Sequence, residues 1–187
     1  MKSMKFIIAA LLMFSIGSLS AQLKIVPAKS NIVISGTSTL HAWDMKIAQV
    51  NGEVAGSAGK LTSLVMHIPV KSMKSAEGSI MDGKAYDAFD SKKNPTITFT
   101  MSETTPVKVT DGNVEVTLTG MLSMAGVAKK VSFKSTGKVT GNTFQMKGAV
   151  PVKMTEYGMK PPTAIFGTIK CGDAIVVKFD VTVEGTL

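Results

Sequence analysis

The side chains that could do chemistry are few in this sequence of 187 residues. His41 and His67 are its two histidines, and they fall on different predicted strands. No CxxC, HExxH or carboxylate cluster accompanies them to complete a zinc site, and no serine sits in a GxSxG elbow. The glycines form no phosphate-binding loop. We therefore predict no catalytic residue, no metal and no cofactor, and we expect that the protein is not an enzyme.

Cys171 is the one cysteine, between Lys170 and Gly172 in a predicted turn. A single cysteine permits no intramolecular disulfide, so the fold must be stabilised by its core. We interpret Cys171 as structural rather than nucleophilic.

The basic residues are all lysines, and the formal net charge is +8, or +6 without Lys2 and Lys5. Specific nucleic-acid recognition depends on the guanidinium fork of arginine and on basic runs longer than Lys92-Lys93 and Lys129-Lys130. We expect no nucleic-acid partner. The lysines are better explained as keeping strand edges and the outer face soluble.

The first residues have the pattern of a secretory signal peptide. Two lysines precede an apolar run over residues 6–16, which is about half the length that a membrane span needs. Ser18-Leu19-Ser20-Ala21 then offers cleavage after Ala21, with Ser20 as the alternative. We predict a signal peptide over residues 1–21, a mature domain over residues 22–187, no stable membrane anchor, and a periplasmic or secreted location.

Residues 82–101 contain the clearest local pattern. Asp82 is predicted to cap a short helix that carries Tyr86 and Phe89, and Asn94-Pro95 forbids its continuation. From Thr96 onward polar and apolar side chains alternate, which predicts a half-buried strand. Its inward face carries Ile97, Phe99 and Met101.

Two further strands are predicted before this helix, over residues 32–38 and 39–47. Alternation along the second places His41, Trp43, Met45 and Ile47 together on the inward face. Residues 50–59 are expected to form a glycine-rich turn region. A strand with Leu64, Met66, Ile68 and Val70 follows, with His67 on its outer face and Pro69 near its end.

The second half of the chain is predicted to be a series of hairpins. Turns are expected at residues 111–113, 125–126 and 141–142. Inward positions on the strands between them are Val116, Leu118 and Gly120, then Val131 and Phe133, then Phe144, Met146 and Gly148, and finally Ile175, Val177, Phe179, Val181 and Val183. Eight or so strands with one short helix predict an all-β fold. A closed antiparallel barrel is the best fit, and a two-sheet sandwich is the alternative.

The inward faces are almost wholly apolar, with His41 as their one titratable group. Methionine, which adapts to irregular apolar shapes, recurs among them. Gly120 and Gly148 are expected to remove side chains that could fill a barrel. This pattern is compatible with two interpretations, a packed core and an apolar tunnel. His41 must find a hydrogen bond there, either with backbone, which we favour, or at the polar end of a ligand site.

Several segments together resemble the YceI-like family of bacterial proteins. They are Ser38-Thr39-Leu40-His41 through Trp43 and Asp44-Met45, the helix with Tyr86 before residues 94–99, Leu118-Thr119-Gly120 into Gly126-Val127 and Val131, and residues 155–173. The resemblance implies an exported lipocalin-like barrel of eight antiparallel strands whose apolar tunnel holds a polyisoprenoid, a quinone tail or a fatty-acid amide. It implies no catalytic activity. The chain departs from the family pattern at residues 81–85, where an Arg-Asp-x-His-Leu run is replaced and the head-group contacts are altered.

We therefore expect an exported protein that binds a long-chain isoprenoid-type lipid. The candidate ligand-binding residues are His41, Trp43, Met45, Met66, Phe89, Ile97, Phe99, Met101, Phe133, Phe144, Met146 and Phe166. The alternative is a solid-cored envelope stress or accessory protein that binds protein partners with its outer face. A homodimer is left open.

Overall fold

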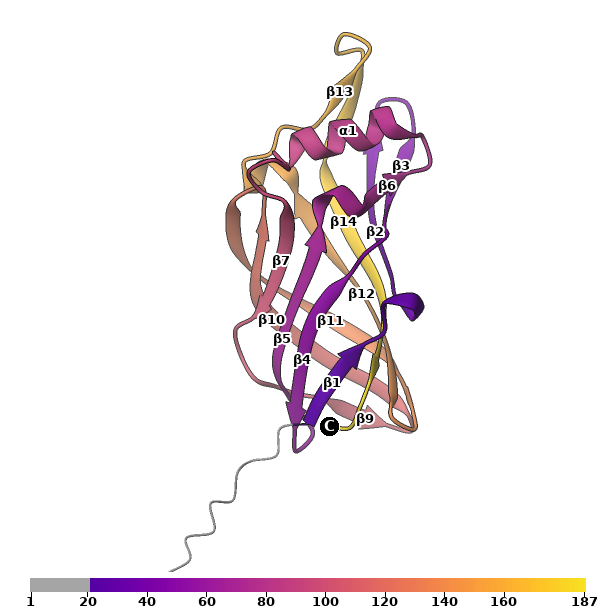
Figure 1. Cartoon of the computed structure of the whole chain (residues 1–187), viewed down its shortest axis with the longest axis vertical. Coiled ribbons are helices and arrows are strands. Elements are labelled where there is room, and N and C mark those ends of the chain that lie inside the picture. Colours follow the sequence, from indigo (N-terminus) through magenta and orange to yellow (C-terminus); the bar gives the residue numbers. More distant parts are fainter. Residues whose placement is uncertain (1–20) are drawn as a thin grey trace, which may run out of the picture.

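The structure is a computed structural model that describes residues 21–187. Eight antiparallel strands form a closed barrel in the order β1-β4-β5-β7-β10-β11-β12-β14, and β14 pairs with β1 to close it (Figure 1). These strands are Ala21–Ile25, Asn51–Ser57, Lys60–Pro69, Thr96–Met101, Asn113–Met124, Val127–Thr140, Thr143–Lys153 and Ile169–Glu184. The predicted all-β barrel is confirmed. The predicted signal peptide lies outside the described residues except for Ala21.

A second group of strands extends the sheet near the helix end of the barrel. The first half of β14 pairs with β2 (Asn31–Ser38), which pairs with β3 (Ala42–Ile47), which in turn pairs with β6 (Met73–Ser75). Three strands of two or three residues, Thr105–Pro106 (β8), Lys108–Thr110 (β9) and Thr163–Ala164 (β13), pair at the edges. The 3-10 turns are Pro27–Lys29 (η1), Val70–Ser72 (η2) and Met154–Tyr157 (η3).

One α-helix, α1 (Ser79–Ala88), lies across one end of the barrel among the described residues, and the C-terminus lies at the opposite end (Figure 1). No helix within residues 21–187 is long and apolar enough to cross a bilayer.

The hairpin turns follow from X-Gly pairs. Ala58-Gly59, Asp111-Gly112 and Ala125-Gly126 each have two successive positive φ values, between 48° and 81°. Two left-handed residues form the tight turn whose twist matches the flanking strands. The predicted turns at residues 111–113, 125–126 and 141–142 are confirmed.

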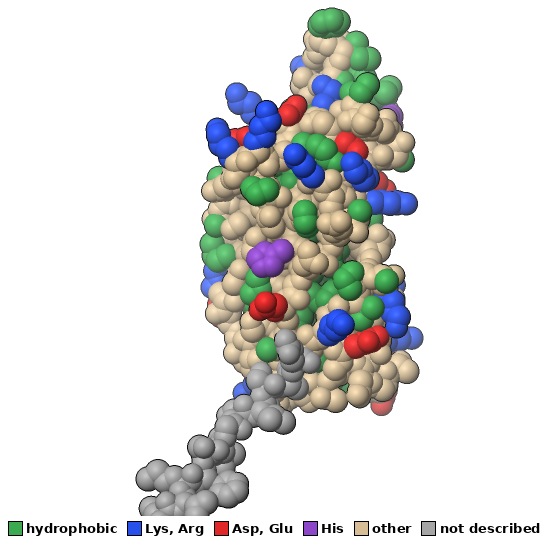
Figure 2. Space-filling view, in the orientation of Figure 1, with side chains coloured by type: hydrophobic (Ala, Val, Ile, Leu, Met, Phe, Trp, Pro, Cys, Tyr) green, Lys and Arg blue, Asp and Glu red, His purple; other side chains and the backbone are tan. Residues whose placement is uncertain are grey.

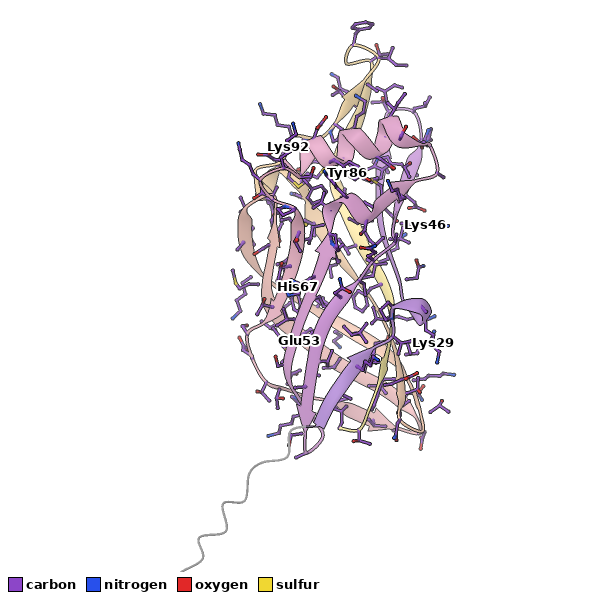
Figure 3. All side chains as sticks on the ribbon, in the orientation of Figure 1. Lys29, Lys46, Glu53, His67, Tyr86 and Lys92 are labelled. Atoms are coloured by element: carbon purple, nitrogen blue, oxygen red, sulfur yellow. The ribbon has the colours of Figure 1, made fainter. Side chains whose placement is uncertain are left out.

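The strand faces also agree with the alternation. Ile97 and Phe99 on β7 are buried, as are Val116, Leu118 and Leu122 on β10. His67 is exposed on the outer face of β5, and Figure 3 shows it with Lys29, Lys46 and Glu53 on the outside of the molecule. The inward faces meet in a single core cluster that runs through the barrel.

Three local predictions are wrong. Most of the predicted turn region at residues 50–59 is the barrel strand β4 (Asn51–Ser57), and only Ala58-Gly59 forms a turn. Gly52 and Gly56 fit in this strand because other side chains press against the backbone there: a Cβ at Gly52 would lie 2.8 Å from Ile25 Cδ1. Asp82 does not cap α1, whose N-cap is Gly78. Cys171 lies within β14 instead of a turn.

Candidate ligand-binding cavity

The interior of the barrel contains a cavity of about 180 Å³. All eight barrel strands and β2 contribute to its wall. Of the 23 lining residues, 22 are apolar: Ile25, Ile32, Ile34, Val54, Leu61, Leu64, Met66, Ile68, Ile97, Phe99, Val116, Leu118, Leu122, Met124, Val131, Phe133, Met146, Val150, Val177, Phe179, Val181 and Val183. The remaining one is Ser135.

Ser135 does not make the cavity polar. It is 1% exposed, and its hydroxyl donates to the carbonyl of Lys147 at 3.1 Å. Because the Ser135 hydroxyl already donates to backbone, a ligand in the cavity would be held by shape complementarity and dispersion contacts rather than by hydrogen bonds. Such a wall selects for an apolar chain.

Three phenylalanines cross the interior from different strands. The ring centroids of Phe99 and Phe133 are 5.4 Å apart, and those of Phe133 and Phe179 are 5.8 Å apart. Both separations fall in the range of favourable tilted and edge-to-face pairs. The rings therefore form a connected wall segment that joins β7, β11 and β14.

The glycines opposite these rings have a different role from the predicted one. A Cβ at Gly120 would lie 2.8 Å from Phe99 Cζ, and a Cβ at Gly148 would lie 2.7 Å from Phe179 Cε1. The space left by each glycine is occupied by an aromatic ring, so Gly120 and Gly148 do not open the tunnel. The cavity results from barrel closure around medium-sized side chains instead.

A second, smaller pocket of about 30 Å³ lies beneath α1. Trp43, Met45 and Phe89 line it, with Met73, Met81, Met154 and Met159 among the other lining residues. Ile34 borders both this pocket and the barrel cavity. The two spaces are neighbours along the barrel axis, with the helix above the smaller one.

The structure divides the twelve candidate residues among separate places. Met66, Ile97, Phe99, Phe133 and Met146 line the barrel cavity, while Met45, Trp43 and Phe89 line the pocket beneath α1. Met101 is half-buried and packs against the core cluster outside the cavity wall. Phe144 lies at the C-terminal end with Leu187, and Phe166 is fully exposed at the tip of the β13–β14 hairpin.

The predicted inward orientation of His41 is wrong. β3 begins at Ala42, and residues 38–41 form a turn in which the Ser38 amide donates to the His41 carbonyl at 2.9 Å. Strand parity therefore does not extend to His41, whose Nε2 lies 3.5 Å from Glu77 at the surface. Trp43 is half-buried, its ring covers Gly36, and its Nε1 donates to the Thr37 carbonyl at 3.0 Å.

A network of polar and charged side chains connects α1 to the neighbouring strand β6. Asp82 accepts from the Ser75 amide at 2.8 Å and from Lys74 Nζ at 3.0 Å. The Ser75 hydrogen bond is the larger cause that lowers the pKa of Asp82, and the hydrogen bonds to Tyr86 and Asp82 raise the pKa of Lys74. This network, which the sequence analysis missed, fastens α1 to β6.

Cys171 is not activated. Burial is the main cause that raises the pKa of its thiol, and the Glu77 carboxylate adds to the shift. Because the thiolate is the nucleophile, a raised pKa favours the inert thiol at neutral pH. Within residues 21–187 no three His, Cys, Asp or Glu side chains gather in a way that could hold a metal ion.

The closed eight-stranded antiparallel barrel with an apolar interior defines a lipocalin-like class of protein. The chain belongs to the YceI-like domain family, whose family model matches residues 23–183. Both the fold and the family predicted from the sequence are confirmed. No curated protein sequence matches the chain.

Solved structures of three bacterial proteins share the fold. BcnA of Burkholderia cenocepacia is 21% identical, with a TM-score of 0.69 over 85% of this chain and 99% of that chain. A polyisoprenoid binding domain from Saccharophagus degradans, implicated in plant cell wall breakdown, is 15% identical, with a TM-score of 0.66 over 89% and 98%. The Campylobacter jejuni YceI protein is 18% identical, with a TM-score of 0.58 over 73% and 81%. Because the sequence identities are this low, the three comparisons show a shared fold and nothing more specific.

Proposed function

We propose that this protein is an exported, periplasmic lipid-binding protein that holds a long-chain isoprenoid-type amphiphile, such as a polyisoprenoid or a quinone, in its barrel. The observation that carries the proposal is the apolar cavity, whose one polar lining residue already bonds to backbone. The S. degradans domain with the same fold binds polyisoprenoid, which supports the choice of ligand class. The cavity also favours this function over a solid-cored accessory protein.

Binding in such a site depends on the chain rather than the head group. Each methylene moved from water into an apolar site contributes about 0.8 kcal/mol before ordering costs are subtracted. Because the lining has no free polar group, a head group inside the barrel would gain no comparable binding free energy from hydrogen bonds. Chain length should therefore control affinity.

The cavity must expand to hold a long chain. Its volume of about 180 Å³ is below the roughly 300–1,000 Å³ of ordinary small-molecule pockets. Met66 and Met146 line it, and methionine side chains have three rotatable bonds that let them move aside. We propose that these methionines, with the phenylalanine rings, make room for the ligand.

Export is supported by the sequence pattern of residues 1–21. No catalytic activity is part of the proposal. The cavity offers no titratable group to a bound chain.

The proposal is tested by titrating the purified protein with a series of amphiphiles that share one head group and differ in chain length. Affinity should rise more than about tenfold for every two methylenes until the cavity is full. Leu118→Trp, which fills the cavity, should abolish this dependence, whereas Thr117→Trp on the outer face of the same strand should preserve it. Circular dichroism confirms that both variants fold. Equal affinity across the series for the wild-type protein would reject the tunnel.

A further inference from the structure

The β13–β14 hairpin projects from the helix end of the barrel and carries apolar side chains at its tip (Figure 1). Ile165 is 65% exposed and Phe166 is fully exposed, so neither contributes to the core. Figure 2 shows hydrophobic side chains covering the end of this projection. Large apolar side chains left in water at such a position mark a contact surface.

The backbone of the tip is strained by the residues it carries. Ile165 and Phe166 have φ values of 48° and 50°, and the Gly167 amide donates to the Ala164 carbonyl at 3.1 Å. Gly167 follows with a φ of 85°, and the Thr168 amide donates to the Ile165 carbonyl at 3.0 Å, so three successive left-handed residues lie in the loop between Ala164 and its strand partner Ile169. Glycine and asparagine are the residues that adopt such φ values most readily. A β-branched or bulky side chain is disfavoured there. The loop therefore has a conformational cost while it holds two large apolar side chains mostly in water, which points to a contact outside the barrel.

Two further exposed apolar side chains lie at the helix end, Leu40 in the turn before β3 and Ile80 in the first turn of α1. Among residues 23–187 six large apolar side chains are exposed, and Leu40 (66%) and Ile80 (79%) join Ile165 and Phe166 at the helix end. The Thr39 amide donates to the Lys170 carbonyl at 3.0 Å, which holds the Leu40 turn against the hairpin. We call these four residues the apolar tip.

The base of the hairpin is basic. Lys170 is the strand partner of Thr163, Lys160 precedes Pro161-Pro162, and Lys84 on α1 donates to the Thr163 carbonyl at 2.6 Å. None of these three lysines forms an ion pair with a carboxylate of residues 21–187, and the nearby Glu77 carboxylate faces His41 at 3.5 Å. An apolar tip with lysines behind it that are not neutralised by these carboxylates matches the layers of an anionic bilayer, where lysine heads meet phosphates and apolar side chains enter the acyl boundary.

We propose that the apolar tip docks the barrel reversibly on the surface of an anionic phospholipid bilayer. A protein partner would need roughly 1,200–2,000 Å² of total buried surface, which a narrow projecting turn does not offer, whereas a bilayer accepts a single inserted turn. Docking brings the helix end of the barrel, with the pocket beneath α1, to the membrane. It goes beyond the proposed function, because it does not require a lipid inside the barrel.

The test is flotation of the purified, exported protein with vesicles of phosphatidylcholine alone or with phosphatidylglycerol. The wild-type protein should bind the anionic vesicles and be released by salt. Ile165→Asn/Phe166→Gly supplies the residues that the turn favours, so it should fold at least as stably while its partition onto vesicles falls by about tenfold or more. Val109→Ser, which removes an exposed apolar side chain elsewhere on the barrel, should leave partition unchanged.

The lysines at the base of the hairpin should contribute to binding of anionic vesicles only. Lys160→Gln and Lys170→Gln should each weaken binding to anionic vesicles by about fivefold and leave binding to neutral vesicles unaltered. Wild-type binding by the folded Ile165→Asn/Phe166→Gly protein, or no binding of the wild-type protein to either vesicle, would overturn the proposal. Lipid binding by the barrel is measured separately on the same preparations. Vesicle binding by protein that yields no extracted lipid and also fails to bind added isoprenoid alcohol or quinone would reject the proposed function and leave docking intact.

Discussion

At the residue scale, Asp82 shows how a single side chain organises the helix end. It is 6% exposed and accepts two hydrogen bonds, from the Ser75 amide and from Lys74. Lys74 Nζ in turn lies 2.9 Å from the Tyr86 hydroxyl, which is 2.9 Å from the Met73 carbonyl (Figure 3 labels Tyr86). From the sequence Asp82 resembles a helix cap, because aspartate is favoured there. Its true partners lie on β6, which local propensity does not reveal.

Replacing Asp82 with alanine should lower the free energy of unfolding at neutral pH by about 1–3 kcal/mol, since the Ser75 amide loses its partner. The pKa of Asp82 is lowered in the folded state, so its stabilisation is fully present above the ordinary value of 3.8 and is lost as pH falls through the folded pKa. Urea unfolding at pH 7 and pH 3 measures this effect. Asp87→Ala on the exposed face of the same helix is the control, and an equal loss there would contradict the assignment.

Replacing either of two glycines with alanine should change the free energy of unfolding, but in opposite directions. Gly148→Ala should destabilise the barrel by about 1–3 kcal/mol, because the new methyl group would press on the Phe179 ring. Gly83→Ala in α1 meets nothing within 4 Å and should stabilise the protein by about 0.5–1 kcal/mol through helix propensity. Thermal unfolding distinguishes them. A neutral Gly148→Ala would mean that Phe179 is not held against β12.

At the element scale, strands with uninterrupted alternation could be predicted from sequence and strands with glycines could not. β7 and β10 follow period two from end to end, and their buried faces are the predicted ones. The sequence predicts a turn region at β4 because glycines such as Gly52 and Gly56 normally weaken strands. Their presence in a strand is explained only by the neighbouring residues that pack closely against their backbone. β1 was missed because it directly follows the signal-like segment. The predicted inward position of His41 is wrong because β3 begins at Ala42, three residues later than predicted, so His41 precedes the strand.

The register of β7 can be tested by two neighbouring substitutions. Phe99 is 9% exposed and lines the cavity, so Phe99→Asp should bury an unpaired charge and prevent accumulation of folded protein. Thr98 faces outward beside His67, at 3.4 Å, so Thr98→Asp should be tolerated. Soluble yield and circular dichroism compare the two. Equal tolerance would mean that the strand is shifted by one residue.

At the scale of the whole molecule, the closure of the barrel is the feature that local patterns cannot supply. β14 pairs with β2 along its first part and with β1 near its end, and this change of partner closes the barrel and sets the cavity volume. Such pairings join residues more than a hundred positions apart. The sequence therefore indicated the apolar lining, through residues such as Met66, Phe133 and Met146, but it could not decide between a packed core and a tunnel.

The central claim is that the barrel holds a long-chain lipid. Its most direct test is extraction of the purified, exported protein with organic solvent, followed by mass spectrometry of the extract against a calibrated standard. We predict about one long-chain isoprenoid-type molecule for each barrel. Folded Leu118→Trp protein should contain far less, and Thr117→Trp protein should contain as much as the wild type. The claim would be contradicted if the wild-type extract contained no stoichiometric lipid and the protein also failed to bind added isoprenoid alcohol or quinone.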